Sequence, residues 1–220
     1  MNVKNKIKAV IFDLDGTLAN TAGDLCAAMN SMLEYYGYPR VTRTDVLTHI
    51  NHGAFNFVKG CLPEGNQSDK DVIAAKEIYS RYYAEKYCEE TYDYAGMKDL
   101  CRDLKERKIK LAVLSNKQDE FTKIIIAKLY GGIFDIVMGG QPENLPLKPN
   151  PASAIFIAGR LDAYPRECLY VGDSDVDMET SLRAGMNTVG VSWGDRNEEI
   201  LAGAGAEYII HSARELLDLL

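Results

Sequence analysis

The stretch Val10–Leu18 constrains the fold most, because an apolar run ends there on two acidic residues. Residues 9–12 are all apolar, which is typical of a strand in a parallel sheet that is covered on both faces. Asp13 and Asp15 follow, and the glycine and threonine after them indicate that the strand ends. Two carboxylates there repel each other and lose hydration, so a cation or a proton must compensate them unless this is only a solvated turn. No glycine-rich nucleotide-binding motif follows.

Strands and helices alternate over the second half of the chain. Alternation of this kind predicts an α/β fold with a doubly wound parallel sheet covered by helices. A last helical pattern runs to Leu220. The further apolar runs of strand length are residues 111–114, 136–138, 168–171, 188–191 and 208–210.

Residues 20–90 carry only helical patterns. Thr42 and Asp45 have the spacing of a capping box that opens one helix, and the tyrosine-rich helix over 69–88 is interpreted as part of a helical core. Asp15 and Ser115, each at the end of a predicted strand, are 100 residues apart. One crossover between parallel strands needs far fewer residues. We therefore predict a core domain of residues 1–19 and 93–220 that carries an inserted helical cap domain, residues 20–92.

Composition narrows the class of partner. The formal net charge is −7, which disfavours general binding to nucleic acids or anionic membranes, and an anionic substrate would need locally placed cations. The five cysteines include no Cys-x-x-Cys pair and are interpreted as reduced. No long apolar segment follows the N-terminal lysines, so we expect neither a signal peptide nor a spanning helix, and a cytoplasmic location. Oligomeric state is left open between monomer and dimer.

Polar side chains that could take part in catalysis or ligand binding follow several of the predicted strands. In an open parallel sheet, ligands bind beyond the carboxyl ends of the strands, so these groups converge if their strands are neighbours. Lys148 precedes a predicted helix after a fourth strand and would supply a local cation. An EF-hand-like calcium loop beginning at Asp173 is excluded, because Met178 and Ala184 stand where the glycine and the acidic ligand are required. The clusters are Asp13 with Asp15, Ser115 with Asn116, and Asp173 with Asp175 and Asp177.

Together these residues resemble the four motifs of the haloacid dehalogenase-like superfamily, in their usual order along the chain. The helical insert resembles the cap of its phosphoglycolate phosphatase and β-phosphoglucomutase branch. The resemblance implies a Rossmann-like core with an inserted α-helical cap. Superfamily members that act on phosphate esters have an aspartate at the place of Asp15, unlike the dehalogenases. The residues that carry the resemblance are Asp13-x-Asp15-Gly16-Thr17, Ser115, Lys148 and Gly172-Asp173-x-x-x-Asp177.

The resemblance also implies roles. Asp13 would be the nucleophile that forms an aspartyl-phosphate, and Asp15 the general acid and base. Mg²⁺ would be held by Asp13, Asp173 and the main-chain carbonyl of Asp15, with Asp177 a weaker candidate for the metal. The Ser115 hydroxyl, the main-chain N–H of Asn116 and Thr17 would contact the phosphate, and Lys148 would neutralise the charge it shares with Asp13.

Substrate choice is expected to lie in the cap, around the glycine-containing break at Asn51-His52-Gly53, where His52 and Gly53 are the candidate substrate contacts. The function implied is a Mg²⁺-dependent phosphatase for a small phosphorylated metabolite, similar to phosphoglycolate phosphatases. The alternatives are a phosphomutase of the β-phosphoglucomutase type and a non-catalytic binding protein on the same fold. Further cap candidates are Arg43, His49, Asn51 and Lys59.

Overall fold

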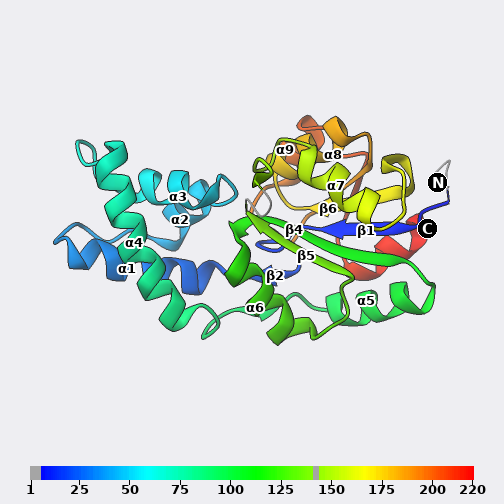
Figure 1. Cartoon of the computed structure of the whole chain (residues 1–220), viewed down its shortest axis with the longest axis horizontal. Helices are drawn as coiled ribbons and strands as arrows, with labels where there is room; N and C mark the ends of the chain where they lie inside the picture. Colours follow the sequence, from blue (N-terminus) through cyan, green and yellow to red (C-terminus); the bar gives the residue numbers. More distant parts are fainter. Residues whose placement is uncertain (1–5, 141–143) are drawn as a thin grey trace.

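The computed structural model describes residues 6–140 and 144–220, and its centre is a six-stranded sheet with helices on both faces (Figure 1). The strands were expected from the apolar runs, and the structure confirms all six and their parallel pairing. They are β1 Ala9–Phe12, β4 Lys110–Gln118, β5 Ile136–Gly140, β6 Cys168–Gly172, β7 Asn187–Val191 and β8 Tyr208–Ile210.

The strand order is β5-β4-β1-β6-β7-β8, so the chain begins in the middle of the sheet and builds outward in both directions. β1 pairs with β4 on one side and with β6 on the other, with Phe12 opposite both Val113 and Val171. An order that reverses beside the first strand creates a crevice beyond the carboxyl ends of the strands at that point. The residues after β1, β4 and β6 therefore face a common space.

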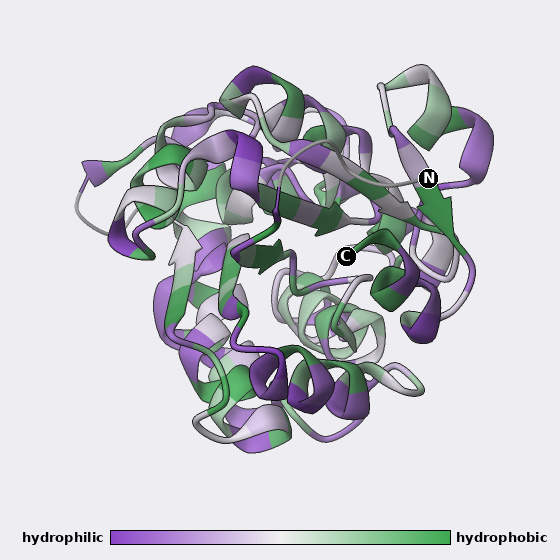
Figure 2. Ribbon diagram, turned by 90° about the vertical axis from the view of Figure 1, so that its right-hand side faces the viewer, coloured by the Kyte–Doolittle hydropathy of each residue, from purple (hydrophilic) through white to green (hydrophobic). Residues whose placement is uncertain are grey.

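Alternate residues of β1 enter two different cores. Val10 and Phe12 pack with α5 (Met97–Glu106), α6 (Asp119–Tyr130) and the C-terminal 3₁₀ helix η3 (Ala213–Leu219). Ala9 and Ile11 pack with α7 (Ala152–Arg160) and α8 (Asp175–Ala184) on the other face. Figure 2 shows the strands as hydrophobic ribbon enclosed by helices of mixed character. The remaining core elements are α9 (Glu198–Gly203) and the 3₁₀ helix η2 (Pro165–Glu167).

Four helices form a separate group beside the sheet (Figure 1). Their apolar faces enclose a third hydrophobic core, to which Tyr79, Tyr83 and, from α6, Phe121 contribute. The Thr42–Asp45 capping box is present, and the break at Asn51-His52 separates α2 from α3. These four helices are α1 Ala22–Tyr35, α2 Arg43–His49, α3 Gly53–Cys61 and α4 Asp69–Lys86.

The chain enters and leaves the helical group through a short antiparallel pair, β2 (Ala19–Asn20) with β3 (Tyr92–Asp93). Buried Asp24 fastens the returning strand, since its carboxylate accepts the main-chain N–H of Glu90 and Thr91, both at 2.9 Å. The division into a core of residues 1–19 with 93–220 and a cap of residues 20–92 stays a prediction.

The closing helix expected up to Leu220 is present as the 3₁₀ helix η3, which buries Ala213 and Leu216. Among residues 6–140 and 144–220, we found no helix with the combined length and hydropathy needed to cross a bilayer.

Candidate active site

Three buried carboxylates meet at the switch point of the sheet. Asp13 follows β1, Asp173 follows β6, and Asp177 lies in the first turn of α8. One oxygen from each lies within 4.8 Å of the other two, and all three side chains are at most 1 % exposed. Residues far apart in the chain therefore form one acidic cluster, as expected from the parallel topology.

The acidic cluster is balanced by Lys148, which is itself buried. Its Nζ lies 2.8 Å from Asp13 Oδ1 and 2.6 Å from Asp177 Oδ1. Burial alone would lower the pKa of Lys148, but the carboxylates of Asp13 and Asp177 outweigh it and raise that pKa well above its usual value. One lysine facing three carboxylates leaves the cluster short of positive charge.

Asp13 is the member with the least compensation. Burial and the nearby charge of Asp177 raise its pKa to about 7, even though Lys148 acts in the opposite direction. Neither of its carboxylate oxygens has a well-aligned hydrogen bond among the described residues, despite the short ion-pair distance from Oδ1 to Lys148. A buried carboxylate in this state calls for a further positive or hydrogen-bonding partner.

Asp173 is held from several sides. Thr17 Oγ1 donates to its Oδ1 at 3.1 Å, and the main-chain N–H of Asp195 donates to its Oδ2 at 2.8 Å. A Cβ on Gly16 or on Gly194 would lie 2.2 Å from an atom of Asp173, so both positions must be glycine for the carboxylate to fit. Burial, followed by the charges of Asp195 and Asp177, raises the pKa of Asp173 well above its ordinary value. Thr17 orients Asp173 here, and its contact with the phosphate stays a prediction.

Asp177 is the most fully engaged of the three carboxylates. Its Oδ2 accepts the Ser174 hydroxyl at 2.6 Å in a capping box that opens α8, and its Oδ1 faces Lys148. This side chain therefore anchors Lys148, and Asp13 and Asp173 have more capacity for a metal ion. The three clustered carboxylates fit a hard divalent cation, because both oxygens of Asp13 lack a well-aligned hydrogen bond among the described residues.

Asp15 faces a different direction, toward the helical group. Both of its oxygens lie near Lys117 Nζ, at 2.9 and 3.1 Å, and Thr21 Oγ1 also donates to it. The sequence predicted Thr21 only as the cap of α1, where its side chain makes no capping hydrogen bond, and it assigned no role to Lys117. The signal for Lys117 was its place two residues after Ser115, at the end of the same strand.

The end of β4 bulges where it meets the site. Leu114 pairs with Met138 but Gln118 pairs with Gly140, so the intervening residues Ser115–Lys117 leave the regular ladder. Such a bulge re-aims side chains. Ser115 and Asn116 are buried beside the acidic cluster, and the Ser115 hydroxyl accepts the main-chain N–H of Lys117 at 3.2 Å.

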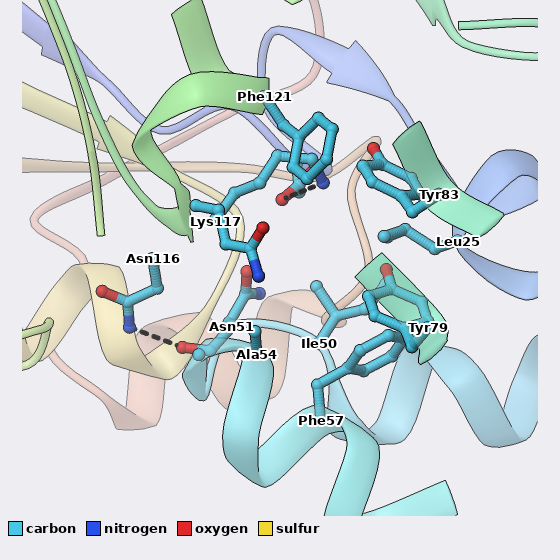
Figure 3. A pocket seen from close by; sticks show the side chains of 13 residues that line it. Leu25, Ile50, Asn51, Ala54, Phe57, Tyr79, Tyr83, Asn116, Lys117 and Phe121 are labelled. Carbon is cyan, nitrogen blue, oxygen red and sulfur yellow. Dashed lines mark hydrogen bonds and ion pairs between the residues drawn. The ribbon is translucent and has the colours of Figure 1, made fainter. Parts of the chain in front are cut away.

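The Asn116 amide joins three segments of the site. Its Nδ2 donates to the carbonyl of Asn51 at 2.7 Å (Figure 3). The same Nδ2 donates to the carbonyl of Lys148 at 2.9 Å, and the Oδ1 accepts the Lys148 N–H at 2.8 Å. The side chain of Asn116 therefore fixes the backbone of the buried lysine and links it to the loop before α3. Sequence reasoning had considered only its main-chain N–H.

The cap candidates separate into those that face the site and those that do not. Asn51 and Gly53 line a pocket that also reaches Asp15, and both have positive φ, 79° each. The side chain of His52 is exposed, and Arg43 donates to Asn20 instead. A substrate contact by His52 stays a prediction. His49 lies against Gly60 of α3, and Lys59 is half-buried outside the pocket lining.

This arrangement has relatives of known name. A family model described as haloacid dehalogenase-like hydrolase matches residues 10–191. The chain belongs to the haloacid dehalogenase-like hydrolases. It is 31% identical to a phosphoglycolate phosphatase of Mannheimia succiniciproducens, over 99% of this chain and all of that protein.

Solved structures give the same answer for the fold. The crystal structure of a putative phosphoglycolate phosphatase from Lactobacillus delbrueckii subsp. bulgaricus has a TM-score of 0.89 and 29% identity, covering 96% of this chain and 97% of that one. A predicted phosphoglycolate phosphatase from Haemophilus somnus has a TM-score of 0.88 and 28% identity, covering 98% of each chain. The chain is thus a haloacid dehalogenase-like phosphatase of the phosphoglycolate phosphatase-like branch.

Proposed function

We propose that this haloacid dehalogenase-like enzyme is a Mg²⁺-dependent phosphomonoesterase for a small phosphorylated metabolite, with phosphoglycolate as the first candidate. The observation that supports this most is the state of Asp13. It is a buried carboxylate with no well-aligned hydrogen bond among the described residues, flanked by Lys148 and by a second carboxylate, Asp173. A nucleophile that must reach phosphorus needs free lone pairs and nearby positive charge.

The first half-reaction transfers the phosphoryl group to the enzyme. A carboxylate oxygen of Asp13 attacks phosphorus, the Asp13–phosphorus bond forms, and the bond between phosphorus and the leaving oxygen breaks. Asp15 gives its proton to that oxygen, so the product leaves as an alcohol. Lys148 and the Ser115 hydroxyl stabilise charge on the phosphoryl oxygens.

In the second half-reaction, Asp15 takes a proton from water as that water attacks phosphorus. The bond between phosphorus and Asp13 breaks, inorganic phosphate is released, and the free carboxylate of Asp13 is restored. Asp13, Asp173 and the main-chain carbonyl of Asp15 would hold Mg²⁺, which when bound supplies positive charge to the nucleophile and the phosphate.

We place the enzyme in the cytoplasm, a proposal supported by its five free cysteines.

The proposed function is tested with an Asp13→Asn variant on phosphoglycolate and on p-nitrophenyl phosphate, with Mg²⁺ and with chelator. We expect phosphate release to require the metal and to fall by at least about 10³-fold in the variant, because the nucleophile is lost. The matched control is Asp99→Asn on the exposed face of α5, which should retain full activity. Undiminished turnover in Asp13→Asn would overturn the mechanism.

A further inference from the structure

A pocket opens beside Asp15, between the helical group and the sheet (Figure 3). Asp15, Asn116 and Lys117 line it from the sheet side. Because Asp15 is the proposed acid for the leaving oxygen, the group that leaves must enter this pocket.

The walls of the pocket are mainly carbon. The helical group contributes aliphatic and aromatic side chains from α1, α3 and α4, and α6 contributes a phenylalanine across from them. Figure 3 shows Phe121 and Tyr83 near the end of Lys117, with Ile50 and Phe57 on the opposite side. An apolar wall stabilises apolar substituents and leaves hydroxyl groups without partners. The apolar and aromatic lining residues are Leu25, Ile50, Phe57, Tyr79, Tyr83 and Phe121.

Two buried polar groups in this lining are unpaired within the described part of the chain. The hydroxyl of Tyr83 and the Nδ2 of Asn51 each lack a hydrogen-bond partner, although Tyr83 is only 1 % exposed and Asn51 9 %. Buried polar atoms are normally satisfied, so unpaired ones in a ligand pocket indicate groups that a ligand completes. Both can donate a hydrogen bond.

Lys117 adds a cation at the mouth of the same pocket. Its Nζ bridges both oxygens of Asp15 and lies 5.1 Å from the centre of the Tyr83 ring. A leaving oxygen within hydrogen-bond reach of Asp15 therefore lies close to Lys117. An acidic group one or two carbons from that oxygen would fall within reach of the ammonium.

We propose that this pocket binds the leaving group of the substrate and favours phosphate esters of short hydroxy acids that carry an apolar substituent. Lys117, Asn51 and Tyr83 receive the carboxylate, and the aromatic and aliphatic walls receive the substituent. This inference rests on the proposed phosphatase function and names the substrate class that the site selects.

Hydrogen-bond chemistry separates this class from sugar phosphates. Lys117, Asn51 Nδ2 and Tyr83 offer donors, and an ionised carboxylate has only acceptors to offer in return. Each hydroxyl of a sugar must also donate, and the lining offers few acceptors: the Asp15 carboxylate is already bound by Lys117 and Thr21, and the amides of Gln118 and Asn51 add one oxygen each. A polyol would thus bury unsatisfied hydroxyls, which costs it binding relative to a hydroxy acid.

The first experiment compares kcat/KM across substrates with Mg²⁺. The panel is phosphoglycolate, the phosphate ester of 3-phenyllactate (both enantiomers), ethyl phosphate and glucose 6-phosphate. We expect the better phenyllactate ester to exceed phosphoglycolate by about 10-fold or more, since burying the substituent favours it, and glucose 6-phosphate to be poorest. A sugar phosphate that matches the acids, or a phenyllactate ester below phosphoglycolate for both enantiomers, would overturn the inference.

The second experiment removes the cation. In Lys117→Met, the ratio of kcat/KM for phosphoglycolate to that for ethyl phosphate should fall by about 10- to 100-fold, the usual size of a lost charged hydrogen bond, and Lys117→Arg should restore part of it. The ratio is taken within one variant, so a general loss of folded enzyme cancels. The matched control is Lys123→Met on the exposed face of α6, which should leave the ratio unchanged.

The outcomes distinguish this inference from the proposed function. If no ester in the panel and no p-nitrophenyl phosphate releases phosphate with Mg²⁺, the phosphatase proposal itself fails. If p-nitrophenyl phosphate is hydrolysed but the Lys117→Met ratio equals that of the unmodified enzyme, only the assignment of the pocket is overturned.

Discussion

At the scale of single residues, the site concentrates negative charge that folding alone does not compensate. Asp13, Asp173 and Asp177 are buried together, and Lys148 pairs with two of them, Asp13 and Asp177. Asp13 and Asp173 both have pKa values raised by burial first and by neighbouring carboxylates second. A raised pKa means that the folded state holds the proton more tightly than the unfolded chain, so ionisation of these groups weakens the fold.

Replacing the nucleophile should therefore stabilise the metal-free protein. Asp13 has a pKa of about 7 when folded against an ordinary 3.8, so the unmodified protein loses stability as pH rises between those values, and Asn avoids that loss. We expect Asp13→Asn to gain up to about 4 kcal/mol at pH 8, reduced by the loss of the ion pair with Lys148, and clearly less at pH 5. Thermal unfolding in chelator at both pH values measures this, and a variant less stable than the unmodified protein at pH 8 would contradict it.

Glycine at position 194 should matter for activity more than for folding. A Cβ there would lie 2.2 Å from the Cβ of Asp173, so Gly194→Ala must displace that carboxylate. We expect kcat to fall by about 10²-fold, because displacements near 1 Å have that effect in preorganised sites.

The control for this steric prediction is Gly159→Ala in α7, where an added Cβ has no neighbour within 4 Å. It should keep full activity and gain about 0.5–1 kcal/mol of stability, as alanine does in a helix interior. Equal activity in Gly194→Ala and Gly159→Ala would show that Asp173 tolerates displacement. Steady-state kinetics with circular dichroism decides between these results.

At the scale of elements, the end of β4 connects the helical group to the buried Lys148. The bulge at Ser115–Lys117 presents three side chains with different tasks, and the Asn116 amide makes three hydrogen bonds, to Asn51 and to both main-chain groups of Lys148. A buried amide that joins two segments in this way couples their positions.

Removing this amide should loosen both segments. Asn116→Ala leaves the carbonyl of Asn51 and two main-chain groups of Lys148 without their partner, so we expect kcat/KM to fall by about 10- to 100-fold. Hydrogen–deuterium exchange should rise around residues 50–54 and 147–149 and remain unchanged in β7 and β8. Unchanged exchange in both segments would contradict the coupling.

Sequence patterns predicted correctly those elements whose formation depends on residues close together in the chain. The six apolar runs and the Thr42–Asp45 capping box appear where they were expected, because burial and capping depend on neighbouring residues. The final segment was expected to be helical and forms a 3₁₀ helix, and periodicity over a few residues does not indicate which kind of helix forms. The pairing of β2 with β3 joins residues more than 70 positions apart, and two-residue strands leave no pattern.

The site was predictable where a strand end signals it. Asp13 and Asp173 converge because β1 and β6 are neighbours, and Lys148 reaches Asp13 from the segment between β5 and α7. Lys117 was missed because its partner, Asp15, lies 102 positions away, and Gly194 because its only constraint is the carboxylate packed against it. Contacts of that kind exist only once the chain is folded.

At the scale of the whole molecule, Phe121 joins the sheet side of the molecule to the helical group through aromatic contacts. Phe121 belongs to α6 beside the sheet, yet it packs in the core of the helical group, with its ring 4.8 Å from that of Tyr83 at 81°. The proposed substrate pocket lies at this junction. Its shape therefore depends on how the two parts are held together.

Truncating this contact should weaken the helical group selectively. We expect Phe121→Ala to cost about 3 kcal/mol, as for other buried phenylalanines, and to raise hydrogen exchange in α1–α4 more than in β1 or β6. Chemical unfolding together with exchange mass spectrometry measures both. An equal rise in the strands would show that the two parts unfold only as one unit.

Uptake of the phosphoryl group by Asp13 is tested most directly by rapid acid quenching of the enzyme with a phosphorus-radiolabelled substrate. We expect an acid-stable label on a single peptide, at Asp13, which chases into inorganic phosphate and does not form in Asp13→Asn. Phosphate release without any labelled enzyme, or a label on another residue, would contradict it.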